Sequence, residues 1–455
     1  MDNEGEPTPL TDPHGYLALF KFNCRLPRCP RTGVSVSYAD IGAPDGIPVL
    51  FVPPSGCSRW FAAPQDPLAA SHNIRLIVVD RPGTGATPMV ALPERIDTSC
   101  QQIASVLEHL DVAPAHMVAT SAGVYIALRL LSAHPGLFLT GLSPPPSVYL
   151  VSPWSPPLPA TDPLAYRQLL DWIPSGVLTT QDTTIPFVFN AVRGMEEAYG
   201  TTTKAVGGAV TAIKSWIGTW TVAPASPALS ATSLEDGRED DTREDGTEVE
   251  LDEKVEEEEP PSRRLWAPTA KYLTTEYLYA EDFRGIGQEH LVCLNRGEID
   301  TGPAWFKTEI DAVAAAVRQE QLGEEVDSCP KGQGEKQTAS EDKTGKDGLP
   351  NHADPGKVGF EPDEPEKAAE IVQHHPETDK VLRLPIDVWW GGLDGMVPRN
   401  GQEWLNKSFA AHPHEIAFVT HFVEDGDHSD LIMRGQGIGE VYLSILTQGH
   451  STTRQ

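Results

Sequence analysis

Apolar residues are scarce in this sequence. Hydrophobic residues make up 39% of the 455 residues and aromatic residues 7%, while 41 prolines and 39 glycines interrupt regular structure. No window approaches the run of about 20 apolar residues that a membrane-spanning helix needs, and the stretch from Met1 to Pro13 has no apolar signal-peptide core. The composition predicts a cytoplasmic protein in which an ordered domain is interrupted by disordered polar sequence.

Cysteine is also sparse. The six residues are scattered and form no CxxC pair, which argues against a zinc site and against a dense disulfide framework. Cys24 and Cys29 are close enough in sequence to form a disulfide, but reduced thiols are the favoured interpretation. We therefore expect neither a metal nor another cofactor.

Basic residues are few, and the net charge of −30 is concentrated in two places. The segment from Glu235 to Glu259 holds fifteen acidic and three basic residues, and the segment from Glu320 to Lys380 holds sixteen and seven. These two segments carry about −12 and −9, so the rest of the chain is only mildly acidic. With no basic face to neutralise phosphates, nucleic acid is not an expected ligand.

The sequence from Val34 to Val151 alternates between short apolar runs and segments of helical period. This alternation predicts βαβ units and a mostly parallel sheet, hence an α/β fold. The first run, Val34–Ala39, alternates between apolar and polar residues as an edge strand does. The predicted strands are Val34–Ala39, Val49–Val52, Ile74–Val79 and Met117–Ala119.

Two helices are predicted between and after these strands. Asp97–Leu110 places its apolar residues on one face, whereas Val124–Leu131 is apolar nearly all round and is expected to be buried. The pattern stops after Trp154 and resumes at Leu384. The elements predicted there are the strands Leu384–Trp390 and Ile416–Phe422 and a final helix, Leu431–Leu446.

These patterns predict one sheet built from both ends of the chain. Residues 1–31 form an N-terminal extension, residues 32–154 and 384–455 form the core, and residues 155–383 form a helical lid insertion. Segments 226–261 and 321–380 of the insertion are acidic, nearly free of aromatics and predicted to be disordered. A solvated spacer is the favoured role for them, although a protein partner of these acidic loops stays open. Helical character is expected in Leu169–Trp172, Ala205–Thr221, Thr269–Phe283 and Trp305–Arg318.

A candidate nucleophile follows the predicted strand at Met117. Ser121 lies in Ala119-Thr120-Ser121-Ala122-Gly123, between a strand and a buried helix. A nucleophilic serine needs a sharp turn that exposes its hydroxyl, a base within reach and N–H donors for the oxyanion. The small residues allow such a turn. By itself, the motif is explained about as well by an ordinary helix-capping serine.

A candidate acid and a candidate base occur near the end of the chain. Asp394 lies in a glycine-rich loop directly after the predicted strand Leu384–Trp390, where a carboxylate can orient an imidazole, although a turn aspartate is an equal explanation. His428 lies in a loop after the last predicted strand, beside Gly426. Histidine is the usual general base. His421 lies inside the strand and is expected to be structural.

In this order, the three motifs resemble those of the α/β-hydrolase superfamily. The turn from Asp80 to Thr87 is similar to the D-x-x-G-x-G-x-S turn of that superfamily, and the segment from Val49 to Arg59 aligns with its strand that ends in His-Gly. The resemblance implies the α/β-hydrolase fold, with a mostly parallel central sheet flanked by helices. It also implies a triad of Ser121, His428 and Asp394.

One departure concerns the oxyanion hole. Pro53-Pro54 stands where the family has His-Gly, and proline has no N–H to donate. By position the donors would be the backbone N–H groups of Ser55 and Ala122, with Gly56 as the alternative to Ser55.

The leading hypothesis is a serine hydrolase that cleaves an ester, thioester or amide bond of a small acyl substrate. Serine rather than aspartate at the nucleophile position argues against epoxide hydrolase or dehalogenase chemistry. The altered oxyanion loop motivates an alternative, a catalytically inactive member that binds a small ligand or a partner protein.

Overall fold

The computed structural model describes most of the predicted core. The predicted helices Leu169–Trp172 and Ala205–Thr221, segment 226–261 and nearly all of segment 321–380 lie outside the described residues. The described residues are 7–112, 115–139, 146–156, 158, 174–184, 268–327, 383–433 and 437–452.

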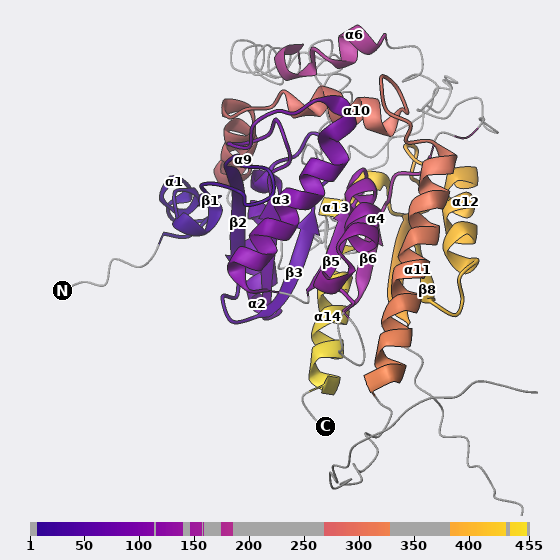
Figure 1. Ribbon diagram of the computed structural model, residues 1–455. Coiled ribbons are helices and arrows are strands. Elements are labelled where there is room, and N and C mark those ends of the chain that lie inside the picture. Colours follow the sequence, from indigo (N-terminus) through magenta and orange to yellow (C-terminus); the bar gives the residue numbers. More distant parts are fainter. Residues whose placement is uncertain are drawn as a thin grey trace, which may run out of the picture.

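An eight-stranded sheet organises the described residues (Figure 1). Its order is β1-β2-β4-β3-β5-β6-β7-β8. The pairs β1/β2 and β2/β4 are antiparallel, and the remaining pairs are parallel. The strands are β1 Cys24–Leu26, β2 Val36–Gly42, β3 Ile47–Val52, β4 Ile74–Val79, β5 His116–Thr120, β6 Val148–Val151, β7 Leu384–Gly391 and β8 Ile416–Val423.

The predicted strands are confirmed, and the sheet is mostly parallel as expected. The edge position expected for Val34–Ala39 is wrong, because β1 pairs outside β2 and covers it. With three residues, β1 is too short to show an alternating pattern. The four residues of β6 are all buried, and β7 pairs with them in register, so residues after 383 complete the sheet that the first half begins.

Helices cover both faces of the sheet. The helices α3 (Arg95–Leu110), α4 (Gly123–Ala133) and α11 (Pro303–Asp327) pack side by side on one face, in front of the sheet in Figure 1. On the other face, α14 (Ile438–Thr452) lies next to α2 (Asp66–Ser71), since Tyr442 contacts His72 with ring centroids 6.3 Å apart.

One predicted helix boundary is wrong. The helix expected at Trp305–Arg318 is α11, which runs on to Asp327, into the segment predicted to be disordered from Gln321. Its final turns are rich in Gln and Glu, which are good helix formers. The predicted final helix, Leu431–Leu446, falls on α13 (His428–Met433) and α14, and residues 434–436 between them lie outside the described residues.

Among the other helices, α12 (Arg399–Ala410) packs against β8. Figure 1 shows α6, α9 and α10 together at one end of the sheet. The α-helices are α1 Pro13–Leu17, α6 Ser175–Leu178, α9 Pro268–Ala280, α10 Gly285–Cys293 and α12 Arg399–Ala410. The 3-10 helices are η1 Phe20–Phe22, η2 Arg59–Gln65, η3 Leu92–Glu94 and η4 Pro135–Leu137.

The cysteines of the described part of the chain, Cys24 and Cys29 among them, are buried free thiols, which confirms the favoured interpretation. Among the described helices, none is both long and apolar enough to cross a membrane.

A partly buried histidine makes the stability of this fold depend on pH. Burial lowers the pKa of His116, at the start of β5, to about 4, and its Nδ1 accepts a hydrogen bond from the N–H of Ser147 at 3.1 Å. At pH 5 the unfolded chain binds a proton that the folded protein does not, so stability falls as the pH drops from 7.5 to 5. The loss from this residue is about 2 kcal/mol.

His116→Asn retains an acceptor for Ser147 and cannot titrate. Between pH 7.5 and pH 5, we expect the free energy of unfolding of the variant to fall by about 2 kcal/mol less than that of the wild type. Urea denaturation at the two pH values measures both. Substitution of the exposed His109 of α3 by Asn controls for the loss of a surface imidazole. Equal pH dependence of His116→Asn and wild type would contradict the assignment.

Candidate active site

Ser121 lies on a sharp turn between β5 and α4. Its φ angle is 49°, in the left-handed region that residues other than glycine rarely adopt. The turn is held on both sides, because the N–H of Ser121 donates to the carbonyl of Val151 at 3.1 Å and its carbonyl accepts from the N–H of Trp154 at 3.0 Å. Strain of this kind persists only where the surroundings enforce it, and it is found most often at functional sites.

Glycine at position 123 allows this turn to form. A Cβ atom on Gly123 would lie 2.7 Å from the carbonyl oxygen of Val52, at the end of β3. The first turn of α4 therefore approaches the backbone of β3 more closely than any larger residue allows. At the other small position, Ala119 is fully buried in β5.

We therefore predict that Gly123→Ala lowers the free energy of unfolding by about 1–3 kcal/mol, the usual cost of overpacking. Gly136→Ala is the matched control, because a Cβ atom there would meet no atom within 4 Å. Chemical denaturation of the two variants and the wild type measures the difference. Equal stability of Gly123→Ala and Gly136→Ala would contradict the close approach.

The structure brings Ser121, His428 and Asp394 together in one hydrogen-bonded chain. His428 Nε2 lies 2.9 Å from Ser121 Oγ, and His428 Nδ1 lies 2.8 Å from Asp394 Oδ2. A carboxylate only accepts, so Nδ1 carries the proton, and Nε2 accepts from the hydroxyl of Ser121. The three residues are 4%, 5% and 9% exposed.

The loop after β7 holds the carboxylate of Asp394 in place. Its Oδ1 accepts hydrogen bonds from the N–H groups of Met396 and Val397, each at 2.9 Å, which leaves Oδ2 for the imidazole. Because these bonds are made with rigid backbone, they fix the plane of the carboxylate and, through it, the orientation of the ring of His428.

His428 begins a short helix, which differs from the expected loop. It is the first residue of α13, and the side chain of Asp427 caps this helix by accepting from the N–H of Asp430 at 2.7 Å. His421 lies inside β8, where its Nε2 is 2.8 Å from Asp387 and its ring stacks on Trp389 with centroids 4.1 Å apart. These contacts agree with a structural role for His421.

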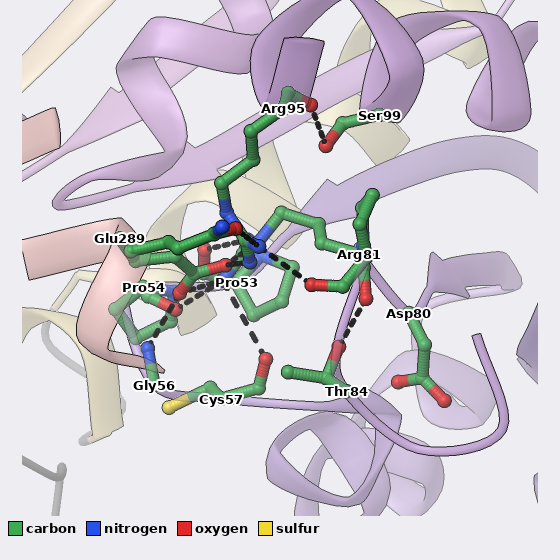
Figure 2. Close-up of polar contacts among 12 residues, drawn as sticks. Pro53, Pro54, Gly56, Cys57, Asp80, Arg81, Thr84, Arg95, Ser99 and Glu289 are labelled. Carbon is green, nitrogen blue, oxygen red and sulfur yellow. Dashed lines mark hydrogen bonds and ion pairs between the residues drawn. The ribbon is translucent and has the colours of Figure 1, made fainter. Parts of the chain in front are cut away.

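The loop expected to form the oxyanion hole follows β3 and is bound by two charged residues (Figure 2). Arg81 donates to the carbonyls of Pro53 and Pro54 at 2.6 and 2.7 Å, and the N–H of Gly56 donates to Glu289 at 2.6 Å. Gly56, the alternative donor, is thus engaged elsewhere. Ser55 and Ala122 stay the predicted oxyanion donors.

Glu289, on α10, was not found by sequence reasoning. Arg81 donates to it from Nε at 2.6 Å, and Arg95 donates from Nη2 at 2.7 Å (Figure 2). Although burial by itself raises the pKa of Glu289, the charges of Arg81 and Arg95 lower it to about 2, so Glu289 is ionised at neutral pH. It lies 208 residues from Arg81 in sequence, and no local pattern marks it.

A small cavity lies between this ion cluster and the turn at Ser121. Its volume is about 30 Å³. The lining combines charged and apolar side chains from the turn after β4, from α3, from α4 with the residue before it, and from α10: Arg81, Arg95, Ile96, Ala122, Tyr125, Ile126, Glu289 and Val292. Within the described ranges, no group of three or more His, Cys, Asp or Glu side chains is placed to hold a metal ion.

The strand order and the parallel pairing from β4 through β8 define the α/β-hydrolase fold, and the chain has that fold. The turn between β5 and α4, the loop after β7 and the first residue of α13 bring the three candidate residues together.

Comparisons with known proteins give short or weak likenesses. No family model matches the chain. A stretch of 105 residues is 33% identical to the "Putative non-heme bromoperoxidase BpoC" of Mycobacterium tuberculosis, and this match spans 23% of the chain and 39% of that protein.

Solved structures align over most of the chain at low similarity. A hydrolase from Pseudomonas aeruginosa PA01 is 13% identical with a TM-score of 0.44, and the alignment covers 93% of this chain and 98% of that one. An esterase from Exiguobacterium antarcticum is 11% identical with a TM-score of 0.43, over 91% and 96% of the two chains. The fold assignment therefore rests on the sheet itself.

Proposed function

We propose that the protein is a serine hydrolase that cleaves an ester, thioester or amide bond of a small acyl substrate. The observation that carries the proposal is the continuous hydrogen-bonded chain from Asp394 through His428 to Ser121, with the serine on a strained turn. A structural serine has no need of a buried imidazole at 2.9 Å that is itself oriented by a buried carboxylate.

The geometry supports a two-step reaction. Ser121 Oγ attacks the acyl carbon while its proton passes to His428 Nε2, and the carbonyl electrons move to the oxygen. When this intermediate collapses, the bond to the leaving group breaks and the leaving group takes the proton from His428. Water then attacks the acyl-enzyme in the same way, which releases the acid and restores Ser121. Asp394 holds the ring and stabilises the imidazolium.

The N–H groups of Ser55 and Ala122 are the proposed donors to the oxyanion. Neither Pro53 nor Pro54 has an N–H, and that of Gly56 is bound to Glu289, so Ser55 is the remaining donor at the start of this loop. Ala122, the residue after the nucleophile, precedes α4, and the partial positive charge at the start of that helix favours an anion there.

The insertion, residues 155–383, is the proposed source of substrate specificity. Its helix α10 supplies Glu289 and Val292 to the cavity beside Ala122, so at least this part of the insertion forms a wall near the nucleophile. By contrast, α11 packs along α4 beside the sheet.

The proposed location of the protein is the cytoplasm.

We expect a fluorophosphonate probe to label the wild type and to leave Ser121→Ala unlabelled, because the probe reacts with an activated serine hydroxyl. Ser152→Ala is a matched control, since Ser152 is also buried and also has a positive φ angle, 45°. Mass spectrometry of the labelled peptide identifies the site. Equal labelling of Ser121→Ala and wild type, or no labelling of either, would sink the serine-hydrolase proposal and favour a ligand-binding protein.

Asp394 and His428 are expected to act as a unit with Ser121. Asp394→Asn and His428→Ala should each lower kcat for a p-nitrophenyl ester by about 10³-fold or more, with little change in KM, and the double variant should lose hardly more than either single one. His421→Ala is the control within the neighbouring strand. Additive losses, or a larger loss for His421→Ala than for His428→Ala, would contradict the proposed base.

A further inference from the structure

Both peptide groups that flank Ser55 are held by buried charges. The carbonyl of Pro54 accepts a hydrogen bond from Arg81 at 2.7 Å, and the N–H of Gly56 donates to Glu289 at 2.6 Å. In a planar trans peptide the C=O and N–H bonds point in opposite directions. Fixing the carbonyl of Pro54 therefore fixes the direction of the N–H of Ser55, and fixing the N–H of Gly56 holds the next peptide plane.

Glu289 and Arg81 form one clamp rather than two separate contacts. Arg81 uses Nε and one Nη for the carboxylate, at 2.6 and 3.0 Å, and its donors also hold the carbonyls of Pro53 and Pro54. Arg95 holds the same carboxylate from α3 at 2.7 Å and donates to the carbonyl of Pro82 at 2.6 Å. The loop after β3, the turn after β4 and α10 thus share one network (Figure 2).

Stability alone is a poor explanation for this network. Arg81, Arg95 and Glu289 are all nearly completely buried, and two arginines with one carboxylate leave an excess positive charge. Such a cluster costs much desolvation energy, and apolar residues of similar volume often give equal or greater stability. A buried cluster does, however, impose one geometry on the backbone groups that it binds.

We propose that Glu289 is a positioning residue of the oxyanion hole, which together with Arg81 aims the N–H of Ser55 at the reacting carbonyl. This role rests on the proposed serine-hydrolase function. Since Glu289 is carried by α10, the oxyanion hole is complete only while this helix of the insertion is seated against the turn at Arg81. Because Pro53 and Pro54 have no N–H, the oxyanion hole depends on the N–H of Ser55 from this loop. The clamp holds that N–H in one direction.

The test compares matched oxygen esters and thionoesters in Glu289→Gln and Glu289→Ala. The intermediate formed from a thionoester carries its charge on sulfur, which is a weak hydrogen-bond acceptor. The rate of thionoester hydrolysis therefore depends little on the N–H donors of the oxyanion hole. Glu289→Ala should lower kcat for the oxygen ester by about 10- to 100-fold, because a displaced oxyanion donor is costly. We expect less than about a 3-fold change for the thionoester and little change in KM.

Glu289→Gln retains an acceptor for Gly56 and should recover part of the oxygen-ester rate. Glu309→Ala is the control, because Glu309 on α11 is also a buried carboxylate from residues 155–383, but its hydrogen bonds go to Arg129 and Ser132 of α4, at 3.2 and 2.6 Å, rather than to the loop after β3. Glu309→Ala should change kcat for the oxygen ester and for the thionoester by the same factor. Thermal unfolding of each variant shows whether it folds, and Glu289→Gln carries the test if Glu289→Ala does not.

The outcomes separate the two proposals. A selective loss with the oxygen ester in the Glu289 variants, absent from Glu309→Ala, supports the positioning role. An equal loss with both substrates, or no loss, overturns that role while hydrolysis by the wild type through Ser121 still stands. If the wild type shows no hydrolysis that depends on Ser121, the proposed function fails and the role of Glu289 fails with it.

Discussion

The left-handed backbone at Ser121 is the constraint on which the arrangement of the site depends. A residue with a side chain adopts this conformation only when other contacts outweigh its cost, which is of order 1–3 kcal/mol. Here β6 and the segment after it supply those contacts through Val151 and Trp154, and the absence of a side chain at Gly123 lets α4 pack against β3. The turn therefore depends on the parallel sheet around it, and it places the serine hydroxyl within reach of His428, at the start of α13, which Asp394 of the loop after β7 orients.

Ion pairs connect the sheet and its helices to the segment between residues 268 and 327. Three glutamates of this segment contact arginines that lie before residue 140 in the chain, and two of these glutamates are buried. Buried pairs of this kind add little net stability but penalise any other placement of the segment, because a misplaced helix would leave charges unpaired. The pairs are Glu281 with Arg59, Glu289 with Arg81 and Arg95, and Glu309 with Arg129.

The elements of the sheet were predictable because their signals are local. Strands such as Ile74–Val79 were predicted to the residue, since a buried parallel strand is a short apolar run bounded by turns. Predictions failed where the local signal is weak: the three-residue strand β1 was not predicted, and α11 continues into a polar stretch that composition alone assigns to disorder. Ser121, Asp394 and His428 were identifiable because each follows a strand in the order of a known triad, and their hydrogen bonds agree with that prediction.

By itself, the sequence determined the α/β architecture, the candidate triad and the unusual Pro53-Pro54 loop, because each depends on residues that are neighbours along the chain. Only the tertiary structure decided how that loop is held. Glu289 meets Arg81 across 208 residues, and no periodicity or spacing encodes such a contact. It arises because α10 packs at the end of the sheet where the loop after β3 and the turn after β4 lie, and a buried carboxylate there must find positive partners.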